Sequence, residues 1–293
     1  MSKTDKNFNI KNKSKTVWIA LVIVVAAALG AFLYFKSQKS DTIVFGDTLK
    51  VHYEPAEAGE ERLLKFIAEN IAPDYGIKIE PVGIQDPIIA NGAVADGEYA
   101  ATIYQHEWYL RQVVEANGFG LTSLFPVFQW NFGVYSDKHK SIDELPNGAV
   151  IAIPADIGNQ GQALWLLARE GLVELNPNVE PRTATLRDIV KNPRNFEFKE
   201  LDFLTLPRVL DSVDAALGFI GNFDAGKIPR EKGIFFPPPP RTFAAQFVVG
   251  TKFLNDPQIK KLQKVFADPR VQEYLKTTDD PLVKDSLTAV SDY

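Results

Sequence analysis

The sequence contains no cysteine among its 293 residues, and that absence excludes several kinds of chemistry. The chain can form no disulfide, hold no metal through thiolates and use no cysteine nucleophile. Histidine is scarce as well, because the chain has three, His52, His106 and His139, and none is spaced like a metal ligand on one helix face. We therefore expect no cofactor.

Other catalytic motifs are also missing from the sequence. It has no glycine-rich phosphate loop and no Gly-x-Ser-x-Gly nucleophile elbow. Asp96 and Glu98 lie in an Asp-Gly-Glu turn, where solvated carboxylates are the simplest interpretation. The net charge of −5 argues against nucleic acid as a partner. An enzyme is thus the weaker functional class, and we expect that the protein is not one.

One long apolar run is present near the N-terminus. Val17–Phe35 contains no charged residue, and a helix of that length spans roughly 28 Å, enough to cross a bilayer core once. Lysines dominate residues 1–16, which predicts that this tail stays in the cytoplasm and that the main domain lies on the periplasmic or cell-surface side. Residues 36–41 are predicted as a short polar linker between the apolar run and that domain. The alternative is a signal peptide cleaved near Ala28–Ala31, although the apolar run continues beyond that point.

The stretch Val150–Gly171 predicts a buried strand, a polar loop and a helix. Val150–Ile153 is apolar and ends at Pro154, which cannot donate a hydrogen bond to a central strand ladder. Asn159 is predicted as the helix N-cap, with Gln162 completing a capping box. The free N–H groups at such a helix start can receive a ligand carboxylate. An ordinary strand-to-helix turn is the alternative interpretation.

From Thr42 on, predicted strands and helices alternate, which is typical of α/β lobes with mainly parallel sheets. Before the central stretch we expect strands at Thr48–Tyr53, Ile77–Val82 and Tyr99–Tyr104 and helices at Glu60–Glu69, Pro87–Val94 and Glu107–Asn117. After it we expect strands at Phe196–Leu201, Ala215–Phe219 and Ala244–Gly250 and helices from Thr185 and at Leu206–Asp211, Pro257–Ala267 and Pro269–Leu275. Ligands bind at the carboxyl ends of such strands, so Tyr104-Gln-His106 is a candidate pocket segment. His106 could equally begin a helix without contacting a ligand.

Two segments predict a division into lobes. The aromatic run Phe125–Ser136 suggests a strand that leaves the first lobe, and Pro237-Pro-Pro-Pro240 suggests a stiff return crossing rather than a peptide-recognition motif. We therefore expect lobe 1 to comprise residues 42–135 and 241–293, and lobe 2 to comprise residues 136–240.

Short motifs along most of the chain, in order and spacing, match a known family. They are Ala95-Asp-Gly-Glu98, Tyr104-Gln-His106, Tyr109-Leu110, Ser141-Ile-Asp-Glu-Leu145, Asp188-Ile-Val190, Asn192-Pro193, Leu206-Pro-Arg208, Val213-Asp-Ala-Ala216 and Gly221-Asn222. Together they resemble the MetQ/NlpA family of substrate-binding proteins that serve ABC importers. None of the motifs is decisive alone.

The resemblance implies a type II periplasmic-binding-protein fold, in which two lobes close on a small ligand and the closed form docks on an ABC transporter permease. It also implies an amino acid or related compound as ligand, methionine-like by family. The ligand-binding residues that we expect are Tyr104, His106, Tyr109, Asn159, Gln162 and Asn222.

The chain departs from the family at important positions. Family members carry a lipidated cysteine, and in its absence we expect Val17–Phe35 to be the membrane anchor. The resemblance implies an arginine for the ligand carboxylate where this chain has Gln162, and an asparagine where it has Ile220. A neutral bond in place of a charge-assisted one costs about 1–2 kcal/mol. Free methionine should therefore bind weakly, unless Arg182 or Arg241 supplies the missing charge.

Two other functions fit the same two-lobed scaffold, because one fold hosts several activities. The first is an enzyme, and the second is an anchored sensor or scaffold without a transport role. Ligand-dependent melting distinguishes them, since binding without turnover indicates a binding protein and turnover indicates an enzyme.

Overall fold

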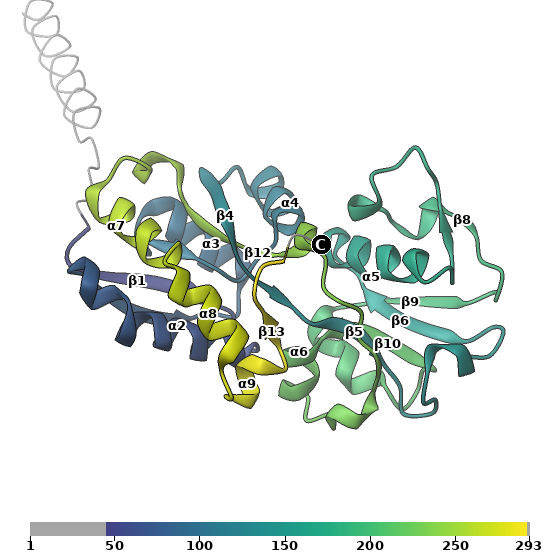
Figure 1. The fold of residues 1–293 in the computed structure, drawn as a ribbon. Helices are drawn as coiled ribbons and strands as arrows, with labels where there is room; N and C mark the ends of the chain where they lie inside the picture. The colour runs from purple at the N-terminus through teal and green to yellow at the C-terminus, as the bar shows by residue number, and fades with distance from the viewer. Residues whose placement is uncertain (1–44, 292–293) are drawn as a thin grey trace, which may run out of the picture. The chain divides into compact units, whose positions relative to one another are not determined.

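Two mixed β-sheets organise residues 45–291, the part of the chain that the computed structural model describes (Figure 1). The predicted tail 1–16, anchor Val17–Phe35 and linker 36–41 lie outside these residues. Among the helices that are described, none has the length and apolar character needed to cross a bilayer.

The first sheet has six strands in the order β13-β4-β12-β3-β1-β2. They are β1 Thr48–Tyr53, β2 Lys78–Gly83, β3 Ala101–Thr102, β4 Leu121–Trp130, β12 Ala245–Gly250 and β13 Leu287–Thr288. β1 pairs in parallel with β2 and β3, whereas β12 runs antiparallel to β3 and β4. The helices around this sheet are α2 Ala58–Asn70, α3 Pro87–Asp96, α4 Glu107–Asn117, α7 Pro257–Phe266, α8 Pro269–Thr277 and α9 Pro281–Lys284. We call this part lobe 1.

The second sheet has five strands in the order β11-β5-β10-β6-β9. They are β5 Phe132–Tyr135, β6 Val150–Pro154, β9 Glu197–Leu201, β10 Ala215–Phe219 and β11 Gly233–Phe235, with a separate pair β7 Glu174–Leu175 and β8 Ile189–Lys191. β6 pairs in parallel with β9 and β10, whereas β5 runs antiparallel to β10 and β11. Its α-helices are α5 Ile157–Arg169 and α6 Ile220–Ala225, and we call this part lobe 2.

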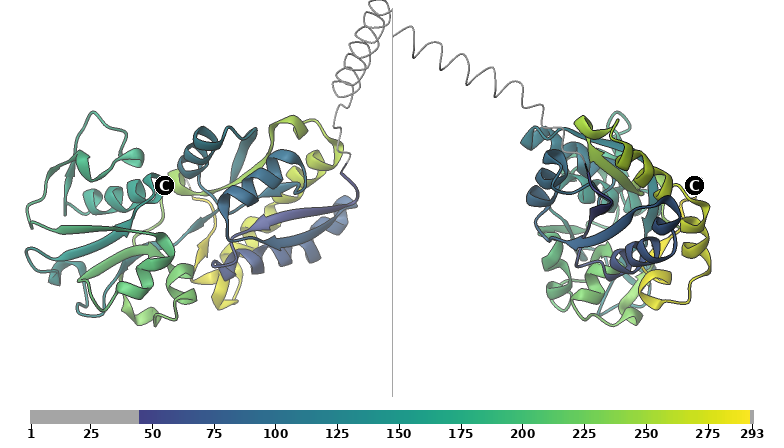
Figure 2. Two further views of the ribbon diagram at one scale, coloured as in Figure 1. Left: turned by 180° about the vertical axis from the view of Figure 1, so that it is seen from behind. Right: turned by 90° about the vertical axis from the view of Figure 1, so that its left-hand side faces the viewer.

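Apolar side chains on one face of α2 form the centre of lobe 1. Leu63, Leu64 and Ile67 recur at helical spacing and are fully buried with Leu49 and Val51 of β1. The polar face of the helix carries exposed pairs such as Glu61 with Lys65. The alternation of charged and apolar residues thus places α2 along lobe 1, against the sheet, as the views of Figure 2 show. Its N-terminus faces the second lobe, since Glu57 lies against Gly221.

The chain crosses between the lobes twice. It passes from β4 to β5 through Asn131, and it returns through the segment that contains Pro237–Pro240. The crossings are tied together, because Gln129 Nε2 donates to the carbonyl oxygen of Pro239 over 2.6 Å. The first crossing is also tied to lobe 2, where Ile220 N–H at the start of α6 donates to the carbonyl oxygen of Asn131 over 3.2 Å.

Several predicted elements have the predicted bounds, among them β1, α4 and β10. The sheets, however, are mixed rather than mainly parallel. β5 pairs with β10 in the second sheet, although the sequence analysis assigned residues 132–135 to lobe 1. The predicted helices near Thr185 and Leu206 are 3₁₀ turns, Leu186–Asp188 and Phe203–Val209, and Pro207 inside the second removes the backbone donor that an α-helix needs there.

The start of α5 also differs from the prediction. The helix begins at Ile157, and its N-cap is Asp156, whose Oδ1 accepts the Asn159 N–H over 2.9 Å. A carboxylate is a stronger acceptor than an amide, so the aspartate three residues earlier caps the helix and no capping box between Asn159 and Gln162 forms. Strand β6 includes Pro154 as its last residue, paired with Leu201.

Gly161 offers a test of how tightly α5 packs in lobe 2. A Cβ at this position would collide with the backbone carbonyl of Arg182, whereas a Cβ at Gly92 in α3 would meet only the Phe119 ring at an ordinary 3.6 Å. We expect Gly161→Ala to lower the free energy of unfolding by about 1–3 kcal/mol. Gly92→Ala, the matched control, should raise it by roughly 0.5–1 kcal/mol. Urea denaturation measures both, and equal effects of the two variants would contradict the packing described.

Candidate functional site

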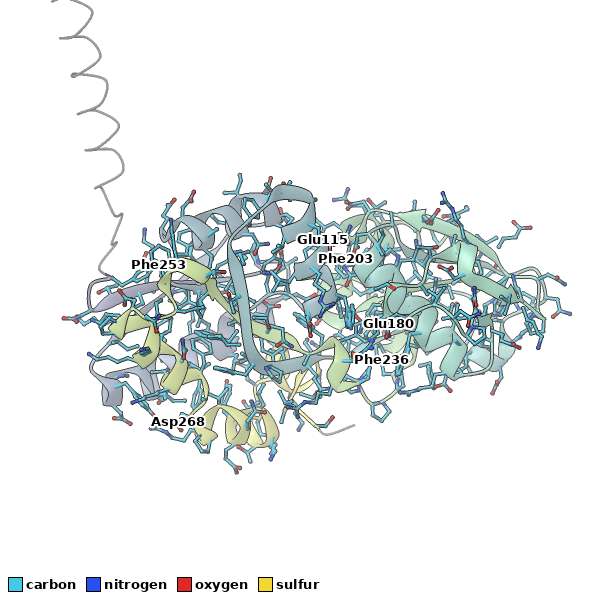
Figure 3. All side chains as sticks on the ribbon, turned by 90° about the horizontal axis from the view of Figure 1, so that it is seen from above. Glu115, Glu180, Phe203, Phe236, Phe253 and Asp268 are labelled. Carbon is cyan, nitrogen blue, oxygen red and sulfur yellow. The ribbon has the colours of Figure 1, made fainter. Side chains whose placement is uncertain are left out.

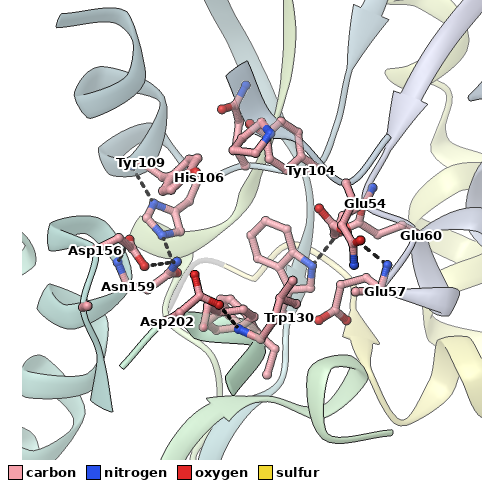
Figure 4. A pocket seen from close by; sticks show the side chains of 18 residues that line it. Glu54, Glu57, Glu60, Tyr104, His106, Tyr109, Trp130, Asp156, Asn159 and Asp202 are labelled. Atoms are coloured by element: carbon pink, nitrogen blue, oxygen red, sulfur yellow. Dashed lines mark hydrogen bonds between the residues drawn. The ribbon is translucent and has the colours of Figure 1, made fainter. Parts of the chain in front are cut away.

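A cavity of about 400 Å³ lies between the two lobes (Figure 4). This volume is in the usual range for small-molecule sites, which extends over roughly 300–1,000 Å³. Its walls come from the ends of β1, β3 and β6 and from the starts of α2, α3, α4 and α5. Strand ends and helix starts are where open α/β sheets bind ligands, so this cavity is the candidate functional site.

A chain of hydrogen bonds joins the lobes on one side of the cavity. His106, the N-cap of α4, accepts the Tyr109 N–H at Nδ1 over 3.1 Å, and its Nε2 lies 3.3 Å from Asn159 Oδ1. Burial lowers the pKa of His106 to about 4, so the ring is neutral and its remaining proton on Nε2 is donated to Asn159. Asn159 Nδ2 in turn donates to Asp156 Oδ2 over 3.0 Å. The bond between His106 and Asn159 therefore bridges lobe 1 and lobe 2.

Close backbone approach supports the same bridge. Gly158, the second residue of α5, lies so near α4 that a Cβ would be 3.2 Å from His106 Cε1 and from the backbone of Tyr109. Gly158 N–H also donates to Gln112 Oε1 over 3.3 Å. The two helix starts thus meet without room for a side chain between them.

Aromatic side chains form much of the cavity wall. They are Tyr104, Tyr109, Trp130, Phe203 and Phe219. Tyr104 is held by Asn91, whose Nδ2 donates to the hydroxyl oxygen over 2.6 Å, and by an edge-to-face contact with His52. Figure 3 shows Phe203 near the junction of the two lobes, away from Phe253 and Asp268 in lobe 1. The site therefore offers flat, polarisable surfaces to a ligand.

Five carboxylates also line the cavity, three from lobe 1 and two from lobe 2. They are Glu54, Glu57, Glu60, Asp156 and Asp202. Asp156 and Asp202 cap helical turns, and Asp202 Oδ1 accepts the Leu204 N–H over 3.0 Å. Glu60 accepts from Trp130 Nε1 and from the Glu54 N–H, both over 2.9 Å. Glu54 Oε1 accepts the Ala56 N–H over 3.0 Å.

Glu57 differs from the other four carboxylates. It is 4% exposed, and it is the N-cap of α2 although its side chain does not cap that helix. Neither of its oxygens makes a hydrogen bond of normal geometry among the described residues, although the Asn222 backbone N–H lies near enough to favour its ionised form. Its Oε2 lies against Gly221 of lobe 2, where any Cβ would collide with it. The side chain thus occupies the junction of the lobes on the side opposite His106, as Figure 4 shows.

Burial raises the pKa of the three glutamates of lobe 1. The pKa of Glu57 rises to about 8, first because of burial and then because of repulsion by Glu54 and Asp224, while the Asn222 backbone N–H opposes the rise. The pKa of Glu54 rises to about 7 through burial, and burial with repulsion from Glu57 raises the pKa of Glu60 well above its ordinary value. These glutamates therefore tend to hold their protons near neutral pH, and a positively charged group beside them would favour the release of those protons.

The structure brings together four of the six site residues expected from the sequence. Tyr104, His106, Tyr109 and Asn159 line the cavity, and His106 is both a helix N-cap and a cavity residue. Gln162 and Asn222 are buried and line no part of it. Because α5 starts three residues earlier than predicted, Gln162 lies deep in the helix, and its Oε1 has no partner among the described residues. Contacts between these residues and a ligand stay a prediction.

Asn222 instead positions a cavity residue. Its Nδ2 donates to the carbonyl oxygen of Phe203 over 2.8 Å, which fixes the turn that presents the Phe203 ring. Neither arginine considered as a substitute charge lines the cavity. Arg182 pairs with Glu180, donates to Thr242 Oγ1 over 2.8 Å and lies over the Trp108 ring. Arg241 donates to the carbonyl oxygen of Ser291.

Sequence reasoning missed the three glutamates and Trp130. The signal was present, because Glu54 directly follows the strand Thr48–Tyr53, and Glu57 and Glu60 follow at intervals of three residues. The rule that ligands bind at strand ends applies to that position as well as to Tyr104. What the sequence could not reveal is that Glu57 faces Gly221, which is more than 150 residues away along the chain.

Two α/β lobes that enclose a small-molecule cavity define the class of the protein, a two-lobed solute-binding protein. Comparison with known proteins then identifies the family. The NlpA lipoprotein family model matches residues 55–286, so the chain belongs to the NlpA lipoprotein family. The resemblance to the MetQ/NlpA substrate-binding proteins is confirmed, and with it the expectation of a binding protein rather than an enzyme.

Individual relatives agree with this assignment. The D-methionine-binding lipoprotein MetQ of Salmonella typhi is 36% identical over 181 residues, which are 60% of this chain and 66% of that relative's length. The D-methionine-binding lipoprotein MetQ of Yersinia pestis is 33% identical over 69% of this chain and 80% of its own length. A nutrient binding protein from Burkholderia cenocepacia, solved bound to methionine, is 30% identical and has a TM-score of 0.70, over 83% of this chain and all of that one.

The raised pKa of Glu57 predicts a pH-dependent stability. The folded protein keeps this proton up to about pH 8, whereas the unfolded chain loses it near pH 4.5, so the free energy of unfolding falls as pH rises between these values. The loss is roughly 1.4 kcal/mol for each pH unit crossed. We expect Glu57→Gln to remove part of this dependence in thermal melts between about pH 5 and pH 9, and Glu69→Gln, on the exposed side of α2, to leave it unchanged. An equal effect of Glu57→Gln at both ends of the range would contradict the prediction.

Proposed function

We propose that this protein is an extracytoplasmic solute-binding protein that delivers a small ligand to an ABC importer. The observation that carries the proposal is the cavity between the two lobes, which is lined by strand ends and bridged on one side by the hydrogen bond between His106 and Asn159. Membership of the NlpA lipoprotein family supports it, as do relatives named for methionine binding. The names of these relatives suggest a small solute of amino-acid size, either an amino acid or a related compound such as an amine.

We further propose that the ligand contacts Tyr104, His106, Tyr109 and Asn159. The neutral His106 and Asn159 offer a donor and an acceptor from opposite lobes, so a ligand that bonds to both would favour the closed state. Gln162 and Asn222, which the sequence analysis also expected at the site, are assigned no direct ligand contact because they lie behind the cavity wall.

We also propose that the apolar run Val17–Phe35 tethers the protein to the cell membrane. Its length, its lack of charge and the lysines of residues 1–16 support a single-pass anchor with a cytoplasmic N-terminus. The chain has no cysteine for a lipid, so an apolar helix is the simplest tether. A short polar linker, residues 36–41, would then join the anchor to the binding domain.

Ligand-dependent melting of the full-length protein in detergent tests solute binding. The probes are the twenty amino acids, D-methionine, simple amines and short carboxylic acids. We expect some of these probes, all of one chemical class, to bind and to raise the melting temperature. Binding adds RT ln(1 + [L]/Kd) to the free energy of unfolding, and no probe should be consumed. Consumption of a probe would indicate the enzyme alternative, and the absence of any response would contradict the proposed function.

Small-angle scattering tests closure with the compounds that stabilise the protein. Saturating ligand should reduce the radius of gyration, because both lobes contribute to the cavity. Asn159→Ala removes the acceptor that His106 uses across the lobes and should reduce the compaction. An unchanged radius at saturation would count against closure.

Membrane fractionation tests the anchor. The full chain should stay in the membrane fraction through high-salt and alkaline washes and keep an N-terminus at Met1 or Ser2. A mature N-terminus near Ala31 would show instead that the apolar run is a cleaved signal peptide.

A further inference from the structure

The charge of the cavity points to the chemical class of the ligand, an inference that rests on the proposed solute-binding function. Five carboxylates line the cavity, and among the described residues that line it there is no lysine or arginine. A ligand held by its own carboxylate would place that charge without a positive partner beside glutamates whose own ionisation is already opposed by burial, which is unfavourable. The cavity thus opposes the binding mode that an amino acid would need.

Glu57 is the group that a ligand would satisfy. The other four carboxylates already accept hydrogen bonds from backbone N–H groups or from Trp130, whereas both oxygens of Glu57 lack a partner among the described residues. A buried carboxylate is stable in its charged form only beside a positive charge or several donors. An ammonium group in the cavity would provide both.

The walls favour an organic cation over a metal ion. Trp130, Tyr104 and Phe219 present aromatic surfaces, and the faces of such rings attract ammonium groups. A hard metal ion would need several oxygen ligands at once, and the described residues contain no group of three side chains suited to hold one. We propose that the ligand is an organic cation without a carboxylate, and that its ammonium group pairs with Glu57.

A purely structural role for Glu57 leads to different expectations. Its carboxylate lies against Gly221 and near the Asn222 N–H, so it could serve only to hold α6 of lobe 2 against α2 of lobe 1. In that case Glu57→Gln would reduce closure for every ligand alike. If Glu57 pairs with a cation, the variant should weaken the binding of amines alone.

Calorimetry with matched probes separates these cases in the full-length protein in detergent. Each set shares one apolar body: methionine, methylthiopropylamine and methylthiobutanoate form one set, and phenylalanine, phenethylamine and phenylpropanoate form another. We expect the amine of a set to bind about tenfold or more tightly than the amino acid, and the acid not to bind, since the amine alone pairs with Glu57 without adding a carboxylate.

Two variants complete the test. Glu57→Gln should weaken amine binding by roughly tenfold or more, while the control Glu69→Gln on the outer side of α2 should leave it unchanged. Tighter binding of an amino acid or an acid than of its amine would overturn the cation inference and leave the solute-binding function standing. An equal loss for all ligands in Glu57→Gln would assign Glu57 a structural role. If no probe of any class bound, the proposed function itself would fail.

Proton release gives an independent measurement. A cation that pairs with Glu57 must displace its proton, so amine affinity should rise by up to about tenfold per pH unit between roughly pH 6 and pH 8. The other groups that face Glu57 or the cavity are Glu54, Glu60, Asp224, His106, Tyr104, Tyr109, Asp156 and Asp202. Of these, Glu54, Glu60 and Asp156 also have pKa values that burial raises, and Glu54 and Glu60 strengthen the dependence. His106 stays neutral and both tyrosines stay protonated in this range. An amine affinity that does not change with pH would contradict the pairing.

Discussion

A buried carboxylate without a partner, Glu57, is the constraint on which the junction of the two lobes depends. Its oxygen occupies the place where any residue other than glycine at position 221 would carry a Cβ. The next residue, Asn222, holds the carbonyl oxygen of Phe203 and so positions an aromatic wall of the cavity. On the other side, Glu60 accepts a hydrogen bond from Trp130. A buried carboxyl group that is costly to ionise thus lies among the groups that shape the binding surface, and such a cost is tolerated where a ligand relieves it.

The opposite side of the cavity closes by different means. There the lobes meet through the hydrogen bond between the neutral His106 ring and the Asn159 amide, which Asp156 holds in place, and through the close approach of Gly158 to α4. The cavity therefore has one side where a neutral hydrogen bond bridges the lobes and another where Glu54, Glu57 and Glu60 can distinguish ligands by charge.

The family and the cavity carry separate information. The chain shares a fold with proteins named for methionine binding, and the shared fold accounts for two lobes and a site at strand ends. Which ligand enters depends on a few side chains, because one fold supports different specificities. In this chain the acidic side, built from residues at the end of β1 and the start of α2, is what determines the charge of an acceptable ligand.

The sequence by itself determined the α/β class, most helices and strands, the family, and the placement of Tyr104 and His106 at a strand end. These follow from periodicity and local motifs, which act over a few residues. The sequence analysis misplaced the start of α5 and with it Gln162, since it chose Asn159 over Asp156, a stronger acceptor three residues earlier, as the cap. Only the tertiary structure decided that Glu57 meets Gly221 and that no basic side chain among the described residues lines the cavity. Both facts depend on contacts between distant segments, where burial, rather than residue type, sets the charge that a side chain can carry.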